Sequence, residues 1–143
     1  MCNIKNRRAF TMIEVVFVIV ILGILAAVAL PRLAATREDA FVAKAQAKVD
    51  AIRSGLQNYR SKSLLKGNGA VYPASLDSGG KLFSVVTNGV TPGSNAGQWQ
   101  VSGSTYTYST GGHSIVFDYN ASSGTFTCNR SSTSPSSLCD KFE

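Results

Sequence analysis

An uninterrupted apolar run near the N-terminus dominates the pattern of hydrophobic and polar positions. The sixteen residues from Val15 to Leu30 contain no charge and no strong hydrogen-bonding side chain. With Phe10, Met12 and Ile13 the apolar segment reaches about twenty-one residues, which at 1.5 Å per residue matches a hydrocarbon core of roughly 30 Å. This pattern predicts a membrane-inserting helix.

After Pro31 the apolar positions become sparser but keep a helical spacing. They recur every three or four residues, as on one face of a helix: Phe41, Ala45, Val49, Ile52, Leu56 and Tyr59. Gly67 and Gly69 end this pattern, so one helix is predicted from Phe10 to about Lys66. Pro31 lacks a backbone donor and clashes with the preceding turn, so we expect a kink there.

The rest of the chain has the character of short strands separated by turns. The clearest alternation of apolar and polar residues lies at 105–108 and 115–119, joined by Gly111-Gly112, followed by 125–128, with weaker candidates at 82–86 and 99–101. One face of such an antiparallel meander would cover the apolar face of the helix. The sequence therefore predicts an α+β fold, with a long N-terminal helix packed on a small antiparallel β-sheet head.

Charge is distributed unevenly along the chain, whose formal net charge is +6. Residues 32–66 hold eight basic side chains against three acidic ones, whereas residues 67–143 hold three against four. The basic residues of the helix are separated by apolar ones, which is typical of a solvated or partner-facing surface. Binding of nucleic acid by this stretch is the minor alternative.

Glu14 interrupts the apolar segment. A carboxylate near the bilayer core costs about 2.5 to 3.5 kcal/mol on insertion scales, so it usually has a function and a partner. The plainer alternative places Glu14 at the membrane interface, with its carboxylate reaching water. Basic residues before the run, and Glu38 and Asp39 after it, favour a cytoplasmic N-terminus.

The segment Arg7-Arg8-Ala9-Phe10-Thr11-Met12-Ile13-Glu14, followed by the apolar run and Pro31, closely resembles the type IV prepilin and type II secretion pseudopilin family. The resemblance implies that a prepilin peptidase cuts between Ala9 and Phe10 and that Phe10 is N-methylated. It also implies that Glu14 pairs with the N-terminal amine of a neighbouring subunit, and that the helix near Pro31 partly unwinds on assembly. One residue departs from the family, which generally has glycine where this chain has Ala9.

The resemblance implies the following organisation: residues 1–9 are a cleaved leader, 10–31 a transmembrane and filament-core helix, 32–66 its amphipathic continuation, and 67–143 a pilin-like head. The chain would be a structural subunit, anchored in the bacterial inner membrane with a periplasmic head and later part of a periplasmic or cell-surface filament. Its partners would be prepilin peptidase, copies of itself, other pilin-like subunits and, indirectly, an assembly ATPase machinery. No cofactor is implied.

Two alternatives remain open at this point. An ordinary secretory signal peptide would end at Ala27-Val28-Ala29, although Glu14 and the length of the apolar run argue against it. A different function class is a membrane-tethered periplasmic binding module, in which one helix anchors a head that captures DNA or a surface ligand. Such a module has no use for Glu14.

Three cysteines are present, and Cys2 lies in the leader. Cys128 and Cys139 remain as an even pair, which in an exported protein predicts a disulfide. They enclose a serine-rich loop, Asn129 to Leu138, for which no strand or helix pattern is visible. Two free thiols or a metal pair are the less supported alternatives, because His113 is the only histidine.

No catalytic constellation is visible, so we do not expect an enzyme. His113 follows turn glycines, and the sequence marks neither a nucleophile nor an acidic partner for it, which predicts a surface histidine at the end of a hairpin. Residues 118–122 contain an Asn-x-Ser acceptor at Asn120 and resemble the extended sequon of bacterial oligosaccharyltransferases. Glycosylation of Asn120 is one interpretation, and a plain turn is the other.

Overall fold

The computed structural model describes residues 10–143, and for residues 30–35 it describes the backbone alone. The chain divides into two compact units, Met1–Arg37 and Glu38–Glu143, which we describe separately. Helix α1, Met12–Leu65, belongs to both. Ala9 lies outside the described residues, and the side chain of Pro31 is not among those described. The predicted cleavage after Ala9 and the predicted kink at Pro31 both stay predictions.

Helix α1 ends where the glycines were expected to end it. Gly67 and Gly69 have φ angles of 78° and 81°, a left-handed conformation that glycine adopts at little cost. The Gly67 N–H donates to the Leu64 carbonyl at 3.0 Å, and the Asn68 N–H donates to the Ser63 carbonyl at 3.1 Å. These bonds satisfy carbonyls that the end of the helix leaves without partners.

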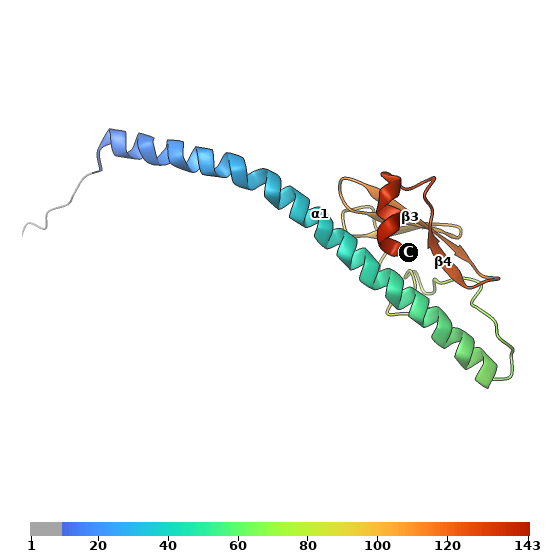
Figure 1. The fold of residues 1–143 in the computed structure, drawn as a ribbon. Coiled ribbons are helices and arrows are strands. Elements are labelled where there is room, and N and C mark those ends of the chain that lie inside the picture. The colour runs from blue at the N-terminus through green and yellow to red at the C-terminus, as the bar shows by residue number, and fades with distance from the viewer. Residues whose placement is uncertain (1–9) are drawn as a thin grey trace, which may run out of the picture. The chain divides into compact units, whose positions relative to one another are not determined.

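The second unit contains one four-stranded antiparallel sheet (Figure 1). Its strands follow chain order as a meander: β1 (Trp99–Ser102), β2 (Thr105–Ser109), β3 (Ser114–Asn120) and β4 (Thr125–Cys128). In the central hairpin Tyr106 lies opposite Phe117, and Tyr108 lies opposite Ile115. The predicted α+β layout is confirmed, including the weaker strand candidate at 99–101.

One face of the sheet and one face of α1 share a common core within the second unit. The buried helix residues recur every three or four positions, and on the sheet side they meet a set of aromatic rings: Val42, Ala45, Val49, Ile52 and Leu56 against Trp99, Tyr106, Tyr108, Phe117 and Phe126. Phe41, predicted on this face, is partly buried at its margin. Val42, which the prediction omitted, is buried instead.

The strand predicted at 82–86 is wrong. Phe83 has a φ angle of 61°, which an extended strand does not allow, and the segment forms turns. The Asp77 side chain fixes this conformation by accepting a 2.9 Å hydrogen bond from the Phe83 N–H. In return the Phe83 ring is fully buried, with its centroid 4.8 Å from that of Tyr106 and 5.1 Å from that of Trp99.

The C-terminal segment is more ordered than its serine-rich sequence indicated. A 3₁₀ helix, η1, covers Ser136–Phe142 and buries Cys139 and Phe142. The Phe142 ring packs edge-on against Phe117, with 5.0 Å between centroids. The expectation of a loop without regular structure is therefore wrong for Ser136–Leu138, which form the first turn of η1, and Cys139 and Phe142 just after them dock this helix on the core.

Candidate functional site

The N-terminal turn of α1 is built by Thr11. Its hydroxyl accepts a 3.3 Å hydrogen bond from the Glu14 N–H, and its carbonyl accepts bonds from the N–H groups of Glu14 and Val15. This arrangement caps the helix. It places Glu14 in the first turn, where a negative charge complements the helix dipole.

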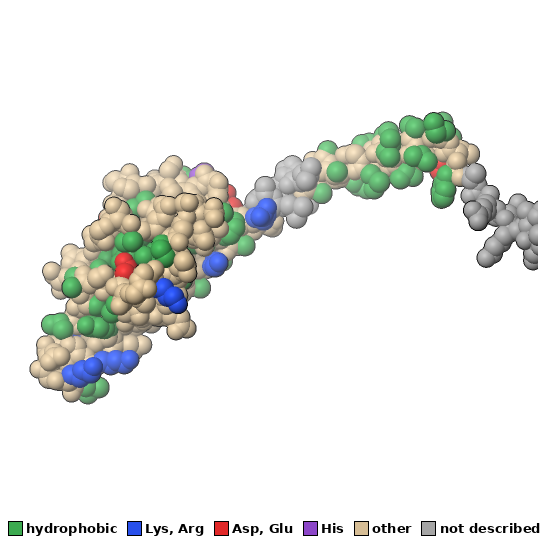
Figure 2. Space-filling model, turned by 180° about the vertical axis from the view of Figure 1, so that it is seen from behind, with side chains coloured by type: hydrophobic (Ala, Val, Ile, Leu, Met, Phe, Trp, Pro, Cys, Tyr) green, Lys and Arg blue, Asp and Glu red, His purple; other side chains and the backbone are tan. Residues whose placement is uncertain are grey.

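The first unit exposes an apolar surface around the helix. Met12–Ala29 is long and apolar enough to cross a membrane, with a mean hydropathy of 2.9, and none of this segment is buried. Figure 2 shows hydrophobic side chains all along this segment. A helix that is apolar all round suits a lipid or a protein core, because in water such a surface would associate or aggregate.

Glu14 is the single charged residue of Met12–Ala29. Within residues 10–143 its carboxylate makes no hydrogen bond or ion pair. Two features thus coincide in the first unit: a surface that needs an apolar surrounding and a carboxylate that needs a partner. Another chain can supply both.

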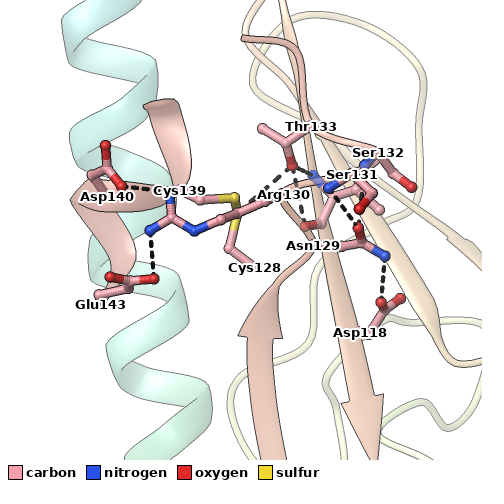
Figure 3. The surroundings of a disulfide bond; sticks show 11 residues. Asp118, Cys128, Asn129, Arg130, Ser131, Ser132, Thr133, Cys139, Asp140 and Glu143 are labelled. Carbon is pink, nitrogen blue, oxygen red and sulfur yellow. Dashed lines mark hydrogen bonds and ion pairs between the residues drawn. A yellow bond between two sulfur atoms is a disulfide. The ribbon is translucent and has the colours of Figure 1, made fainter. Parts of the chain in front are cut away.

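A second candidate site is the disulfide between Cys128 and Cys139, with 5.5 Å between their Cα atoms (Figure 3). It joins the end of β4 to η1. The residues between the two cysteines are fixed by side-chain bonds: the Asn129 amide donates to Asp118 at 2.7 Å, and the Thr133 hydroxyl accepts from the Val116 N–H at 2.9 Å. The Arg130 guanidinium forms exposed ion pairs with Asp140 and Glu143, both at 2.6 Å.

Comparison with known proteins identifies the N-terminal segment. The family model for the prokaryotic N-terminal methylation motif matches residues 4–30, which include Ala9, Phe10 and Glu14. The match assigns the prokaryotic N-terminal methylation motif to this segment of the chain.

One curated relative is similar to part of the chain. The chain is similar to type II secretion system core protein G of Dickeya chrysanthemi, with 39% identity over 56 residues. The aligned part covers 39% of this chain and 37% of the relative, so the likeness spans well under half of each. No solved structure matches the chain significantly.

Among the predicted sites, Phe10 lies two residues before α1 and Glu14 in its first turn, whereas Cys128 and Cys139 lie in the second unit. Ala9 lies outside the described residues. The structure contains the predicted disulfide. It does not test cleavage after Ala9, methylation of Phe10 or the roles of Glu14 and Pro31 in assembly.

Asn120 lies at the exposed end of β3. Its side-chain oxygen accepts hydrogen bonds from the N–H groups of Ser122 and Ser123, at 2.9 and 3.3 Å. This is an Asx turn, which accounts for the Asn-Ala-Ser sequence without any modification. The Asn120 side chain is exposed, so its amide nitrogen is accessible to a modifying enzyme. Glycosylation of Asn120 stays a prediction.

His113 is exposed at the turn between β2 and β3, as predicted. The expectation that it has no acidic partner is wrong. Its Nε2 atom lies 3.4 Å from the Glu38 carboxylate, which also accepts a 3.3 Å hydrogen bond from the Thr110 hydroxyl. These contacts attach the turn to the first residues of the second unit. The described residues contain no group of three or more side chains that could hold a metal ion.

Proposed function

We propose that the chain is a structural subunit of a filament of the type IV pilus or type II secretion class. The observation that carries this proposal is the lone Glu14 at the start of a fully exposed apolar helix, inside a methylation motif. In an isolated membrane anchor, burying this carboxylate in lipid costs free energy, and no interaction offsets the cost. In a filament it gains a cationic partner when subunits meet.

Processing would supply that partner. Cleavage after Ala9 creates a new amine on Phe10, and N-methylation leaves that amine basic. A carboxylate buried with a cation is far less costly than one buried alone. We infer that Glu14 of an incoming subunit pairs with the Phe10 amine of its neighbour, while the apolar surfaces of their helices pack together.

The same helix accounts for localisation before assembly. Residues 10–31 would hold the subunit in the inner membrane, with a cytoplasmic N-terminus and a periplasmic head. Lys5, Arg7 and Arg8 precede the apolar run, and after it Arg37 is adjacent to Glu38 and Asp39; we take this distribution to favour the cytoplasmic N-terminus. Prepilin peptidase, other pilin-like subunits and an assembly ATPase machinery are the partners that this scheme requires.

Within this class, the printed name of the relative, a core protein of a type II secretion system, favours a secretion filament. The disulfide-closed loop instead resembles the C-terminal region of pilins and favours a pilus. Deleting the gene separates the two. Loss of exoprotein secretion with normal surface pili would indicate a secretion filament, and the reverse would indicate a pilus.

Mass spectrometry of the chain isolated from its own membrane tests the processing that the proposal requires. The expected N-terminal peptide begins at Phe10 and carries one methyl group. As a control, Ala9→Gly should give the same peptide, because glycine is also small, whereas a bulky residue at this position should block cleavage. A start at Leu30 or retention of Met1 would contradict the proposal.

A further inference from the structure

The second unit contains an open apolar hollow of about 420 Å³ between α1 and the segment that leads into β1. The helix contributes Lys44, Ala47, Lys48 and Ala51 to its walls, and the other side consists of residues 90–91 and 97–99. Small-molecule sites in proteins measure about 300 to 1,000 Å³, so this volume is within their range. A stable protein contact, by contrast, buries about 800 Å² on each partner. The size of the hollow therefore favours a small ligand.

The walls of the hollow are fixed by the core behind them. Trp99 is buried, and the centroid of its ring lies 5.1 Å from that of Phe83 and 4.9 Å from that of Tyr108. Val90 exchanges two backbone hydrogen bonds with Leu82, both 2.9 Å long. Because these walls are already ordered, binding a ligand would cost little conformational entropy in the protein.

Two ammonium groups border the hollow without a counter-ion. Lys48 donates hydrogen bonds to the Thr87 hydroxyl at 2.9 Å and to the Asn88 carbonyl at 2.7 Å, and both acceptors are uncharged. Burial lowers the pKa of Lys48, because its charge is partly removed from water. Lys44, one turn earlier, is exposed and makes no hydrogen bond or ion pair among residues 10–143. None of the described residues that line the hollow is acidic, so its charge favours an anion.

We propose that the hollow binds a small apolar carboxylate, with its hydrocarbon body against Ala47 and Trp99 and its carboxylate beside Lys44 and Lys48. An ammonium group has three N–H donors, and Lys48 uses two of them within the chain, so one is left for a ligand. The two oxygens of a carboxylate can accept one bond from each lysine. The inference concerns a single subunit and does not depend on the assembly of a filament.

The two parts of such a ligand would contribute unequally to its affinity. Lys44 is exposed, so water and salt screen its attraction for the carboxylate. Removal of the apolar body from water does not depend on salt and scales with the area buried. Filling the hollow should therefore weaken binding more than removing the charge of Lys44.

Fluorescence tests the site directly, because Trp99 is the only tryptophan of the chain. The full-length chain is reconstituted in phosphatidylcholine vesicles, which contain neither tryptophan nor detergent that could occupy the hollow. Titration with phenylpropionate at neutral pH should change the Trp99 emission and reach saturation. Phenylpropionamide has nearly the same shape without the charge, and it should bind at least about threefold more weakly.

Two variants with matched controls test the two parts of the site. Ala47→Phe places a ring in the hollow and should weaken phenylpropionate binding at least about tenfold, whereas Ala40→Phe makes the same change at an exposed alanine outside the hollow and should bind normally. Lys44→Gln should weaken binding about three- to fivefold. Lys62→Gln, at an exposed lysine in the last turn of α1, should leave it unchanged.

Several results would overturn the inference. An emission change that rises without saturation would show partition into the vesicles rather than a site, and equal binding of phenylpropionamide would remove the role of the lysines. This comparison of two ligands uses wild type alone, so it stands whatever the variants do. Ala47→Phe binding like wild type, or Ala40→Phe losing as much, would also overturn the inference. None of these results bears on the proposed function, because the measurement uses subunits outside any filament.

Discussion

The Tyr119 hydroxyl donates a 2.6 Å hydrogen bond to the Pro73 carbonyl, 46 positions earlier in the chain. Tyr119 lies in the central strand β3 and is 6% exposed, and Pro73 lies in the segment that leads from α1 towards the sheet. The bond therefore fixes an otherwise irregular connection to the core.

Tyr119→Phe should weaken the second unit at neutral pH. The variant removes the hydroxyl and leaves the buried Pro73 carbonyl without its partner, which should lower the free energy of unfolding by about 1 to 3 kcal/mol. Denaturant unfolding of the detergent-solubilised chain, followed by near-UV circular dichroism, measures this change. A stability equal to wild type would show that water replaces the lost bond.

Alkaline pH should destabilise the second unit more steeply than it would if its tyrosines were exposed. Burial raises the pKa of Tyr119 to about 12 and also raises the pKa values of Tyr106 and Tyr108. Because an unfolded tyrosine loses its proton near pH 10, the stability is present below pH 10 and is lost as the pH rises towards 12. Unfolding measured between pH 8 and 12 should show this fall, with a smaller slope in Tyr119→Phe.

Cys139→Ser should destabilise the C-terminal segment without affecting membrane insertion. The disulfide joins two cysteines that are 11 positions apart in the sequence, so its loss should lower the free energy of unfolding by roughly 2 to 3 kcal/mol. The measurement is the same denaturant titration, with membrane fractionation as the control for insertion. Peptide mapping without reductant that finds both thiols free in the native protein would contradict the predicted disulfide.

Gly55→Ala should be destabilising, although alanine is the better helix former by about 1 kcal/mol. A Cβ atom at position 55 would collide with the Val86 carbonyl oxygen, which lies against the helix backbone. The neighbouring exposed residue gives a matched control, since Ser54→Ala should be neutral or slightly stabilising. A melting temperature of Gly55→Ala at or above that of wild type would show that the segment at 82–86 yields easily.

The sequence predicted those parts of the fold that depend on local patterns. The period of α1, the glycines after it and the alternation in β2 were sufficient, because each of these two elements buries one face and shows this in a short window. In β3 the consecutive residues Ile115, Val116 and Phe117 are all buried, and its run of β-branched and aromatic residues indicated the strand. Leu82–Val86 failed the same test. The segment is apolar because Phe83 is buried in a turn. The conformation of that turn depends on a hydrogen bond to Asp77, which lies outside the segment and therefore outside its apolar–polar pattern.

The candidate sites divide in the same way. Glu14 was visible because a charge stands out in an apolar run. The Glu38–His113 contact joins residues 75 positions apart, and the Thr133–Val116 bond joins residues 17 positions apart. Neither follows from the spacing of residues, because the packing of α1 and of the segment before η1 against the sheet creates these contacts.

The role of Glu14 separates a filament subunit from a tethered monomer. Glu14→Ala removes the costly carboxylate and should insert at least as well as wild type, because the apolar run drives insertion. Glu14→Gln keeps the size of the side chain and removes its charge. Both variants should fail to assemble if the charge pair with a neighbouring Phe10 amine is required.

The most direct measurement compares the amount of each variant in the membrane fraction with the amount in sheared surface filaments, with that variant as the only source of subunit. The account predicts normal membrane levels of Glu14→Ala and Glu14→Gln with filaments lost, beside abundant filaments of wild type. Normal filaments from either variant would contradict the role assigned to Glu14, and wild type without any higher assembly would indicate a tethered binding module instead.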